Sequence, residues 1–182
     1  NGMFEYIIDP HLIRRGLEYV ARKKTDMIIL HHIAGEGSVE TVNHVDKGRI
    51  GYNIYIRLDG KPYWGRGLEY EGGSVKNTGR TAGVNQRAVA IACEGNFETR
   101  TMPDDQKAML FRIVRDLLQY YPSINTIIGH KDVAATACPG RHFPLAEAKA
   151  LLGEAAEIPA SSTSAAAGAF SFSQSDIVSI NR

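Results

Sequence analysis

Cysteine, tryptophan and long apolar runs are scarce in this chain, and neither sign of charge dominates. The 182 residues include two cysteines, too few for a disulfide framework. They allow one Cys93–Cys138 bridge, which we favour less than two free thiols. The apolar runs, such as residues 27–30, are far too short to cross a bilayer, so we expect no membrane insertion. With 21 basic and 20 acidic residues, the charge balance argues against nucleic acid as the main partner.

The N-terminal residues also lack the basic and then apolar regions of a signal peptide, because Glu5 and Asp9 interrupt them. A composition of 43% hydrophobic and 23% charged residues is typical of an ordinary globular protein. After Pro159 the sequence changes to a low-complexity Ser/Ala-rich stretch. The sequence therefore predicts one folded domain over residues 1–158. Residues 159–182 are predicted to be a linker and the start of an unidentified segment.

Strand and helix patterns alternate along the first 158 residues. The expected strands are 27–33, 52–58, 61–66, 88–94 and 125–130, and the expected helices are 9–24, 38–42, 101–121 and 145–156. The first helix is indicated by an Asp-Pro start and a basic last turn. The glycine-rich residues 69–85 are expected to be mostly loop. This interleaving predicts an α/β fold with a single mixed β-sheet flanked by helices.

Three side chains that bind zinc well lie near or shortly after the ends of two of the expected strands. His31 lies near the end of strand 27–33, His130 ends strand 125–130, and Cys138 comes eight positions later on a loop. Two central strands that end at one edge of a sheet would bring these side chains together. Three protein ligands with an open fourth position form the catalytic arrangement of zinc. The plainer alternatives are strand-end histidines and a buried thiol, and His32 competes with His31 as the ligand.

Together with several further segments, these residues resemble the zinc-dependent N-acetylmuramoyl-L-alanine amidases. That group includes phage amidase-type lysozymes and peptidoglycan recognition proteins. The matching segments are Ile28–Ala34, Ile50–Ile56, Asp59–Arg66, Asn85–Ile91, Glu94–Phe97 and Gly129–Gly140. They cover about residues 25–145 in the family's order and spacing. The chain departs from the family's pattern at Ile33, Asn53 and Ser74–Lys76.

The resemblance implies a peptidoglycan-recognition/amidase type of fold and a hydrolase that binds peptidoglycan. The implied reaction cleaves the amide between N-acetylmuramic acid and L-alanine with a zinc-activated water. The implied cofactor is Zn²⁺, and the implied ligands are His31, His130 and Cys138.

Three further positions match residues with implied roles in catalysis. Tyr52 would lie beside the metal and orient the water or donate a hydrogen bond to the oxyanion, although a core tyrosine is the alternative. Thr136 would stabilise the tetrahedral intermediate, although a threonine in a loop often only bonds the backbone. Glu94 is a conditional candidate for the general base, with a structural carboxylate as the alternative favoured by the sequence.

Two other functions remain open at this point. One is a non-catalytic peptidoglycan recognition domain, which the retained Cys138 argues against. The other is a zinc peptidase that cuts the stem peptide. A catalytic domain followed by a Ser/Ala-rich linker fits a phage endolysin or prophage-derived enzyme that acts at the bacterial cell wall.

Overall fold

The computed structural model describes residues 2–14 and 18–156. The chain divides into two compact units, Asn1–Leu152 and Gly153–Arg182. The domain end predicted at residue 158, and the linker predicted after it, lie outside the described residues. Among the residues described, no helix combines the length and the apolar character needed to cross a membrane.

A five-stranded mixed sheet forms the centre of the first unit. The strands are β1 Met27–His32, β2 Ile54–Ile56, β3 Pro62–Trp64, β4 Ala88–Cys93 and β5 Thr126–Gly129. Their order is β3-β2-β4-β1-β5. All neighbours are parallel except β2 and β3, which form an antiparallel hairpin with the proline-containing strand at the edge. The predicted single mixed sheet is confirmed.

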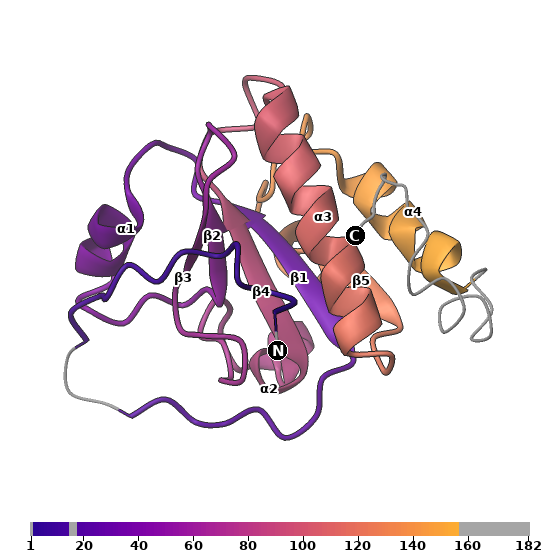
Figure 1. Ribbon diagram of the computed structural model, residues 1–182, viewed down its shortest axis with the longest axis horizontal. Coiled ribbons are helices and arrows are strands. Elements are labelled where there is room, and N and C mark those ends of the chain that lie inside the picture. The colour runs from indigo at the N-terminus through magenta and orange to yellow at the C-terminus, as the bar shows by residue number, and fades with distance from the viewer. Residues whose placement is uncertain (1, 15–17, 157–182) are drawn as a thin grey trace. The chain divides into compact units, whose positions relative to one another are not determined.

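Strands β1 and β4 are buried along their whole length, because they lie inside the sheet and residues such as Val75 and Val84 pack against them. The helices are α1 Val39–Val45, α2 Val84–Arg87, α3 Asp104–Tyr120 and α4 Leu145–Ala156, with 3₁₀ turns η1 Gly79–Thr81 and η2 His130–Asp132. Helix α3 lies across one face of the sheet (Figure 1). Its buried apolar stripe includes Leu110, Ile113 and Leu117, as its helical spacing predicts.

The helix predicted over residues 9–24 is wrong. In the described parts of this range the chain forms no helix, and Ala21 makes an isolated antiparallel bridge with Tyr70. Two of the apolar residues expected to pack on the sheet are exposed instead, Ile13 by 75% and Val20 by 58%.

The physical reason is that Arg22 bonds a distant part of the chain. Its backbone N–H donates to the carbonyl oxygen of Glu69 at 2.7 Å. Its guanidinium donates to the carbonyl oxygens of Leu68 and Tyr70, both at 2.7 Å. These contacts join Arg22 to residues 68–70 instead of to its own preceding turn, so tertiary structure overrides the local pattern there.

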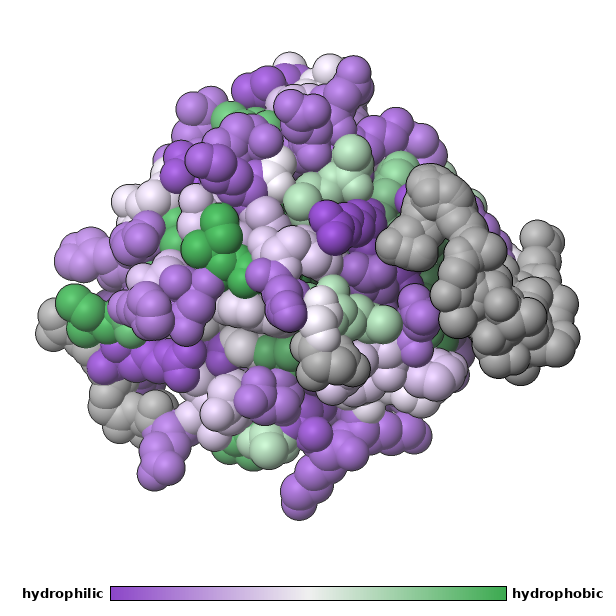
Figure 2. Space-filling model, in the orientation of Figure 1, coloured by the Kyte–Doolittle hydropathy of each residue, from purple (hydrophilic) through white to green (hydrophobic). Residues whose placement is uncertain are grey.

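The surface shown in Figure 2 is mainly hydrophilic, with small, separate hydrophobic areas. Within residues 2–14 and 18–156, the exposed large hydrophobic residues are Ile8, Ile13, Val20, Val45 and Tyr120. Apolar residues exposed singly are normal on a globular protein.

Candidate metal centre

Parallel pairing of β1 and β5 brings two histidines to the same edge of the sheet. Leu30 in β1 pairs with Gly129 in β5, so the next residues, His31 and His130, follow side by side. Their ring centroids lie 4.9 Å apart. His31 is buried, whereas His130 is half-buried at the start of the η2 turn.

Cys138 completes a group of three potential ligands. Its Sγ lies 3.6 Å from Nδ1 of His31 and 3.6 Å from the carbonyl oxygen of His32. One ligand atom from each of His31, His130 and Cys138 can be chosen so that all three lie within 4.8 Å of one another. Two imidazoles and a thiolate are a donor set that suits zinc.

The loop that carries Cys138 is fixed by backbone hydrogen bonds on both sides. The N–H of Lys131 donates to the carbonyl oxygen of Cys138 at 2.8 Å, and the N–H of His142 donates to that of Phe97 at 2.7 Å. Gly140 has a φ of +101° and packs directly against the backbone of Phe97, where a Cβ would collide. A glycine is therefore needed for the loop to reach the turn after β4.

Burial sets the protonation of these groups. It lowers the pKa of His31 to about 3, with help from His130 and His32, and it lowers the pKa of His130. Burial also raises the pKa of the Cys138 thiol to about 11. At neutral pH both imidazoles are neutral and each has a lone pair to offer. The thiol has to lose its proton when it binds a metal.

His31, and not His32, belongs to this group. Adjacent residues of a strand point to opposite faces of the sheet. Nδ1 of His32 accepts a hydrogen bond of 3.0 Å from the backbone N–H of Phe97. The His32 side chain therefore holds the turn after β4, to which the backbone of the Cys138 loop is also bonded through His142 and Phe97.

Tyr52 lies next to the group, just before β2 and not within it as its sequence predicted. Its ring centroid is 5.1 Å from that of His31. Burial, Cys138 and Asp46 raise the pKa of Tyr52 to about 12, so its hydroxyl is protonated and able to donate at neutral pH.

Thr136 is exposed on the Cys138 loop. Its Oγ1 accepts a hydrogen bond of 3.2 Å from the N–H of Cys138. This is the backbone contact that the sequence left open as the alternative. A hydroxyl that accepts in this way still has its own proton to donate.

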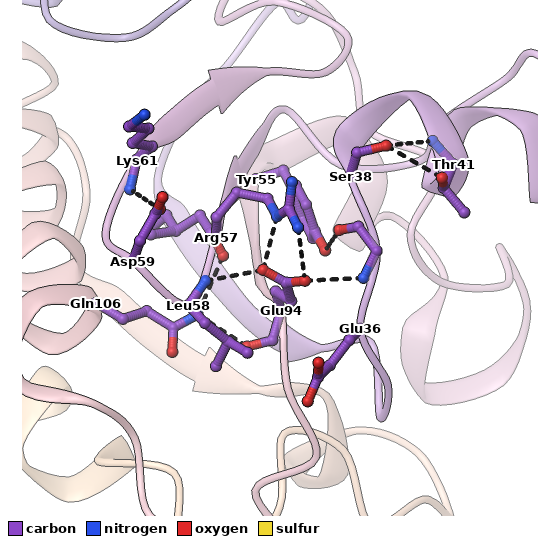
Figure 3. A network of polar contacts seen from close by, with 12 residues as sticks. Glu36, Ser38, Thr41, Tyr55, Arg57, Leu58, Asp59, Lys61, Glu94 and Gln106 are labelled. Atoms are coloured by element: carbon purple, nitrogen blue, oxygen red, sulfur yellow. Dashed lines mark hydrogen bonds and ion pairs between the residues drawn. The ribbon is translucent and has the colours of Figure 1, made fainter.

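Glu94 is held in a different network (Figure 3). Its carboxylate accepts hydrogen bonds from Arg57 at 2.7 and 3.1 Å, and from the N–H groups of Leu58 and Gly37 at 2.9 and 2.8 Å. Burial acts to raise the pKa of Glu94, but these bonds outweigh it and hold that pKa below its usual value. The contacts match a structural carboxylate, the alternative given above. Its role as general base stays a prediction.

The sequence did not predict one contact to the group, and it predicted the state of the two cysteines correctly. The Oγ of Ser74 lies 2.9 Å from Nε2 of His31, although Ser74 was noted only as a departure from the family pattern. No spacing in the sequence brings loop 69–85 against β1. Cys93 is buried and both cysteines are free, as expected.

The chain is similar to known proteins. A family model described as N-acetylmuramoyl-L-alanine amidase matches residues 21–141. Peptidoglycan-recognition protein SC2 of Drosophila simulans is 31% identical over 96 residues, which are 52% of this chain and 49% of that protein. Human N-acetylmuramoyl-L-alanine amidase is 32% identical over 103 residues, which are 51% of this chain and 16% of that protein. The chain thus spans about half the length of the first curated relatives it matches.

Two solved structures show the same fold. The endolysin N-acetylmuramoyl-L-alanine amidase LysCS from Clostridium intestinale URNW has a TM-score of 0.67 and 32% identity, over 80% of this chain and 97% of that one. Peptidoglycan recognition protein LE, solved in complex with tracheal cytotoxin, has a TM-score of 0.64 and 21% identity, over 79% of this chain and 98% of that one.

Proposed function

Because the chain belongs to the N-acetylmuramoyl-L-alanine amidase family, we propose that it hydrolyses the amide between N-acetylmuramic acid and L-alanine in peptidoglycan. One observation carries the proposal: potential ligand atoms of His31, His130 and Cys138 lie within 4.8 Å of one another. The similarity to a clostridial endolysin supports a role in degrading bacterial cell walls, as a phage or prophage enzyme.

The three side chains fit a catalytic zinc ion. Both imidazoles are neutral, the thiol lies beside them, and three protein ligands leave a position open. Bound zinc would supply Lewis acidity, which polarises a substrate carbonyl and makes water nucleophilic at neutral pH. Loss of the Cys138 proton accompanies metal binding, so the protein's zinc affinity should rise with pH.

The chain's own hydroxyl groups act on the substrate. Tyr52, protonated beside His31, donates a hydrogen bond to the oxygen that becomes negative when the amide carbon turns tetrahedral. The exposed Thr136 hydroxyl is a second donor, held by the N–H of Cys138. The loss of one such donor typically lowers kcat by about 100- to 1,000-fold. We assign no step to Glu94 here, because its carboxylate accepts hydrogen bonds from Arg57 and two backbone N–H groups, and its role as general base stays a prediction.

A non-catalytic recognition domain is the second candidate. It is favoured by the relatives that are named as recognition proteins and by a solved complex of one of them with tracheal cytotoxin. The placement of Cys138 beside His31 argues for the enzyme, because a domain that only binds peptidoglycan has no need of a thiolate ligand.

The test compares the wild-type chain with Cys138→Ser and with Cys93→Ala, the matched loss of the other thiol. Zinc content is measured by elemental analysis, and new L-alanine N-termini are counted after digestion of purified peptidoglycan. We expect about one zinc per chain in the wild type and in Cys93→Ala. In Cys138→Ser we expect zinc to be lost, and release to fall by more than roughly 100-fold.

Three results would contradict the proposal. Tight muropeptide binding without zinc or hydrolysis would make the chain a recognition domain. Products cut within the stem peptide, identified by mass spectrometry, would make it a peptidase. Equal activity in the wild type and Cys138→Ser would remove Cys138 from the site.

A further inference from the structure

Ser74 and Cys138 lie at opposite nitrogens of the His31 ring. The Oγ of Ser74 is 2.9 Å from Nε2, and the Sγ of Cys138 is 3.6 Å from Nδ1. His31 is buried, so neither nitrogen has free access to water. The partners of this ring are therefore supplied by the protein.

This arrangement decides which nitrogen of His31 can bind a metal. A neutral imidazole has a proton on one nitrogen and a lone pair on the other. When Nε2 holds the proton and donates it to Ser74, the lone pair of Nδ1 points toward Cys138. The other tautomer would put an N–H group where the metal has to lie. Metal-binding histidines generally donate their second N–H to a neighbouring acceptor in this way.

The loop around Ser74 is fixed on both sides. Before it, the N–H of Gly73 donates to the carbonyl oxygen of Gly51 at 2.9 Å. After it, Val75 forms two hydrogen bonds with the Asn85 amide, which accepts at 3.3 Å and donates at 2.7 Å. The Ser74 hydroxyl therefore reaches His31 from a backbone whose hydrogen bonds do not involve His31, His130 or Cys138.

We propose that Ser74 is a positioning residue, whose hydroxyl accepts the Nε2–H of His31 and thereby fixes the ring and tautomer with which Nδ1 binds zinc. The inference rests on the proposed function, because it takes His31 as a zinc ligand. It assigns a role to a residue at which the chain departs from the family's sequence pattern.

The first test measures zinc affinity by competition with a chromophoric chelator. Ser74→Ala removes only the hydroxyl, and we expect it to weaken zinc binding by about 10- to 100-fold. The metal-free protein should still fold, because Gly73 and Val75 hold the loop, but with a modestly lower melting temperature, because the buried Nε2–H of His31 loses its acceptor. Ser74→Thr retains a hydroxyl and should restore most of the affinity, whereas Ser74→Val, of nearly the same shape, should not.

The second test uses nuclear magnetic resonance of the metal-free protein with ¹⁵N-labelled histidine. We expect His31 to hold its proton on Nε2 in the wild type, and to populate both tautomers in Ser74→Ala. A proton found on Nδ1 in the wild type would overturn the inference. So would equal zinc affinity in the wild type and Ser74→Ala. A wild-type chain that binds no zinc would instead overturn the proposed function, and the inference with it.

Discussion

Glu94 is a buried charge that one guanidinium and two backbone N–H groups stabilise. Its side chain is 4% exposed, and it pairs with Arg57 at 2.7 Å. Two backbone N–H groups complete the set, as Figure 3 shows. A buried carboxylate is tolerated only when it is paired and hydrogen-bonded in this manner. The network joins the end of β4 to the turn after β2 and to the segment before α1.

Replacement of this carboxylate should lower the stability of the fold and leave the candidate ligands His31, His130 and Cys138 unchanged. We expect Glu94→Gln to reduce the free energy of unfolding by roughly 2 kcal/mol at pH 7, because charge-assisted hydrogen bonds are lost. Zinc affinity should stay within about twofold of the wild type, since Glu94 is not a partner of a ligand. Urea denaturation and chelator competition measure the two quantities.

The pH dependence of that difference follows from the direction of the pKa shift. The pKa of Glu94 is lowered in the folded protein, so its stabilisation is present above the unfolded pKa of about 4.3. It is lost as the pH falls through the lower, folded value. The gap between the wild type and Glu94→Gln should therefore shrink in acid. Glu36→Gln, at an exposed carboxylate 4.0 Å from Arg100, is the control and should show no gap. If Glu94→Gln has the stability of the wild type but strongly reduced hydrolysis, Glu94 is the general base.

At the scale of elements, strands and helices were predictable where a segment's own apolar pattern agrees with its burial. The runs in β1 and β4 predict strands because every residue in them is buried, and the spacing in α3 predicts a helix because its regularly spaced apolar residues form one buried stripe. The helix predicted over residues 9–24 failed because Arg22 bonds the carbonyl oxygens of Leu68 and Tyr70. These partners lie more than 40 positions away in sequence, so no local pattern could reveal them.

Two truncations test whether Ile13 packs on the core as it would in the helix predicted over residues 9–24. Ile13→Ala should change the free energy of unfolding by less than about 0.5 kcal/mol, because Ile13 is 75% exposed. Leu117→Ala in α3 should cost about 2 to 5 kcal/mol, because Leu117 is fully buried. Gln119→Ala, on the exposed side of α3, controls for helix propensity. The measurement is chemical denaturation. A similarly large loss of unfolding free energy in Ile13→Ala and Leu117→Ala would support the helix predicted over residues 9–24.

At the scale of the whole molecule, the candidate site joins segments that are far apart in sequence. His31 and Cys138 are 107 positions apart, and Tyr52 comes from a third segment. Family resemblance was enough to nominate these residues, because their order along the chain matches a known pattern. It could not nominate Ser74, whose contact with His31 depends on how one particular loop folds. The family motifs predict the candidate ligands His31, His130 and Cys138. The contact that positions His31 depends on tertiary packing, which the motifs do not encode.

All of the residues that carry the proposal lie well before residue 158. The family match ends at residue 141, and the metal group, Tyr52 and Ser74 lie within it. A domain that contains its whole core and its whole site is expected to fold and act by itself. We therefore predict that a chain ending at residue 158 binds zinc and cleaves a soluble muramyl peptide within about twofold of the full chain.

Insoluble cell walls should distinguish the two chains if residues 159–182 help to hold the enzyme on its substrate. A second attachment raises the local concentration of a catalytic domain without adding a contact at its site. Hydrolysis of sedimented walls should then fall in the shortened chain, while hydrolysis of the soluble peptide does not. The measurement is the release of L-alanine N-termini from both substrates at equal enzyme concentration. Equal rates of wall hydrolysis by the two chains would show that residues 159–182 do not have this role. A loss of zinc from the shortened chain would show that the domain extends beyond residue 158.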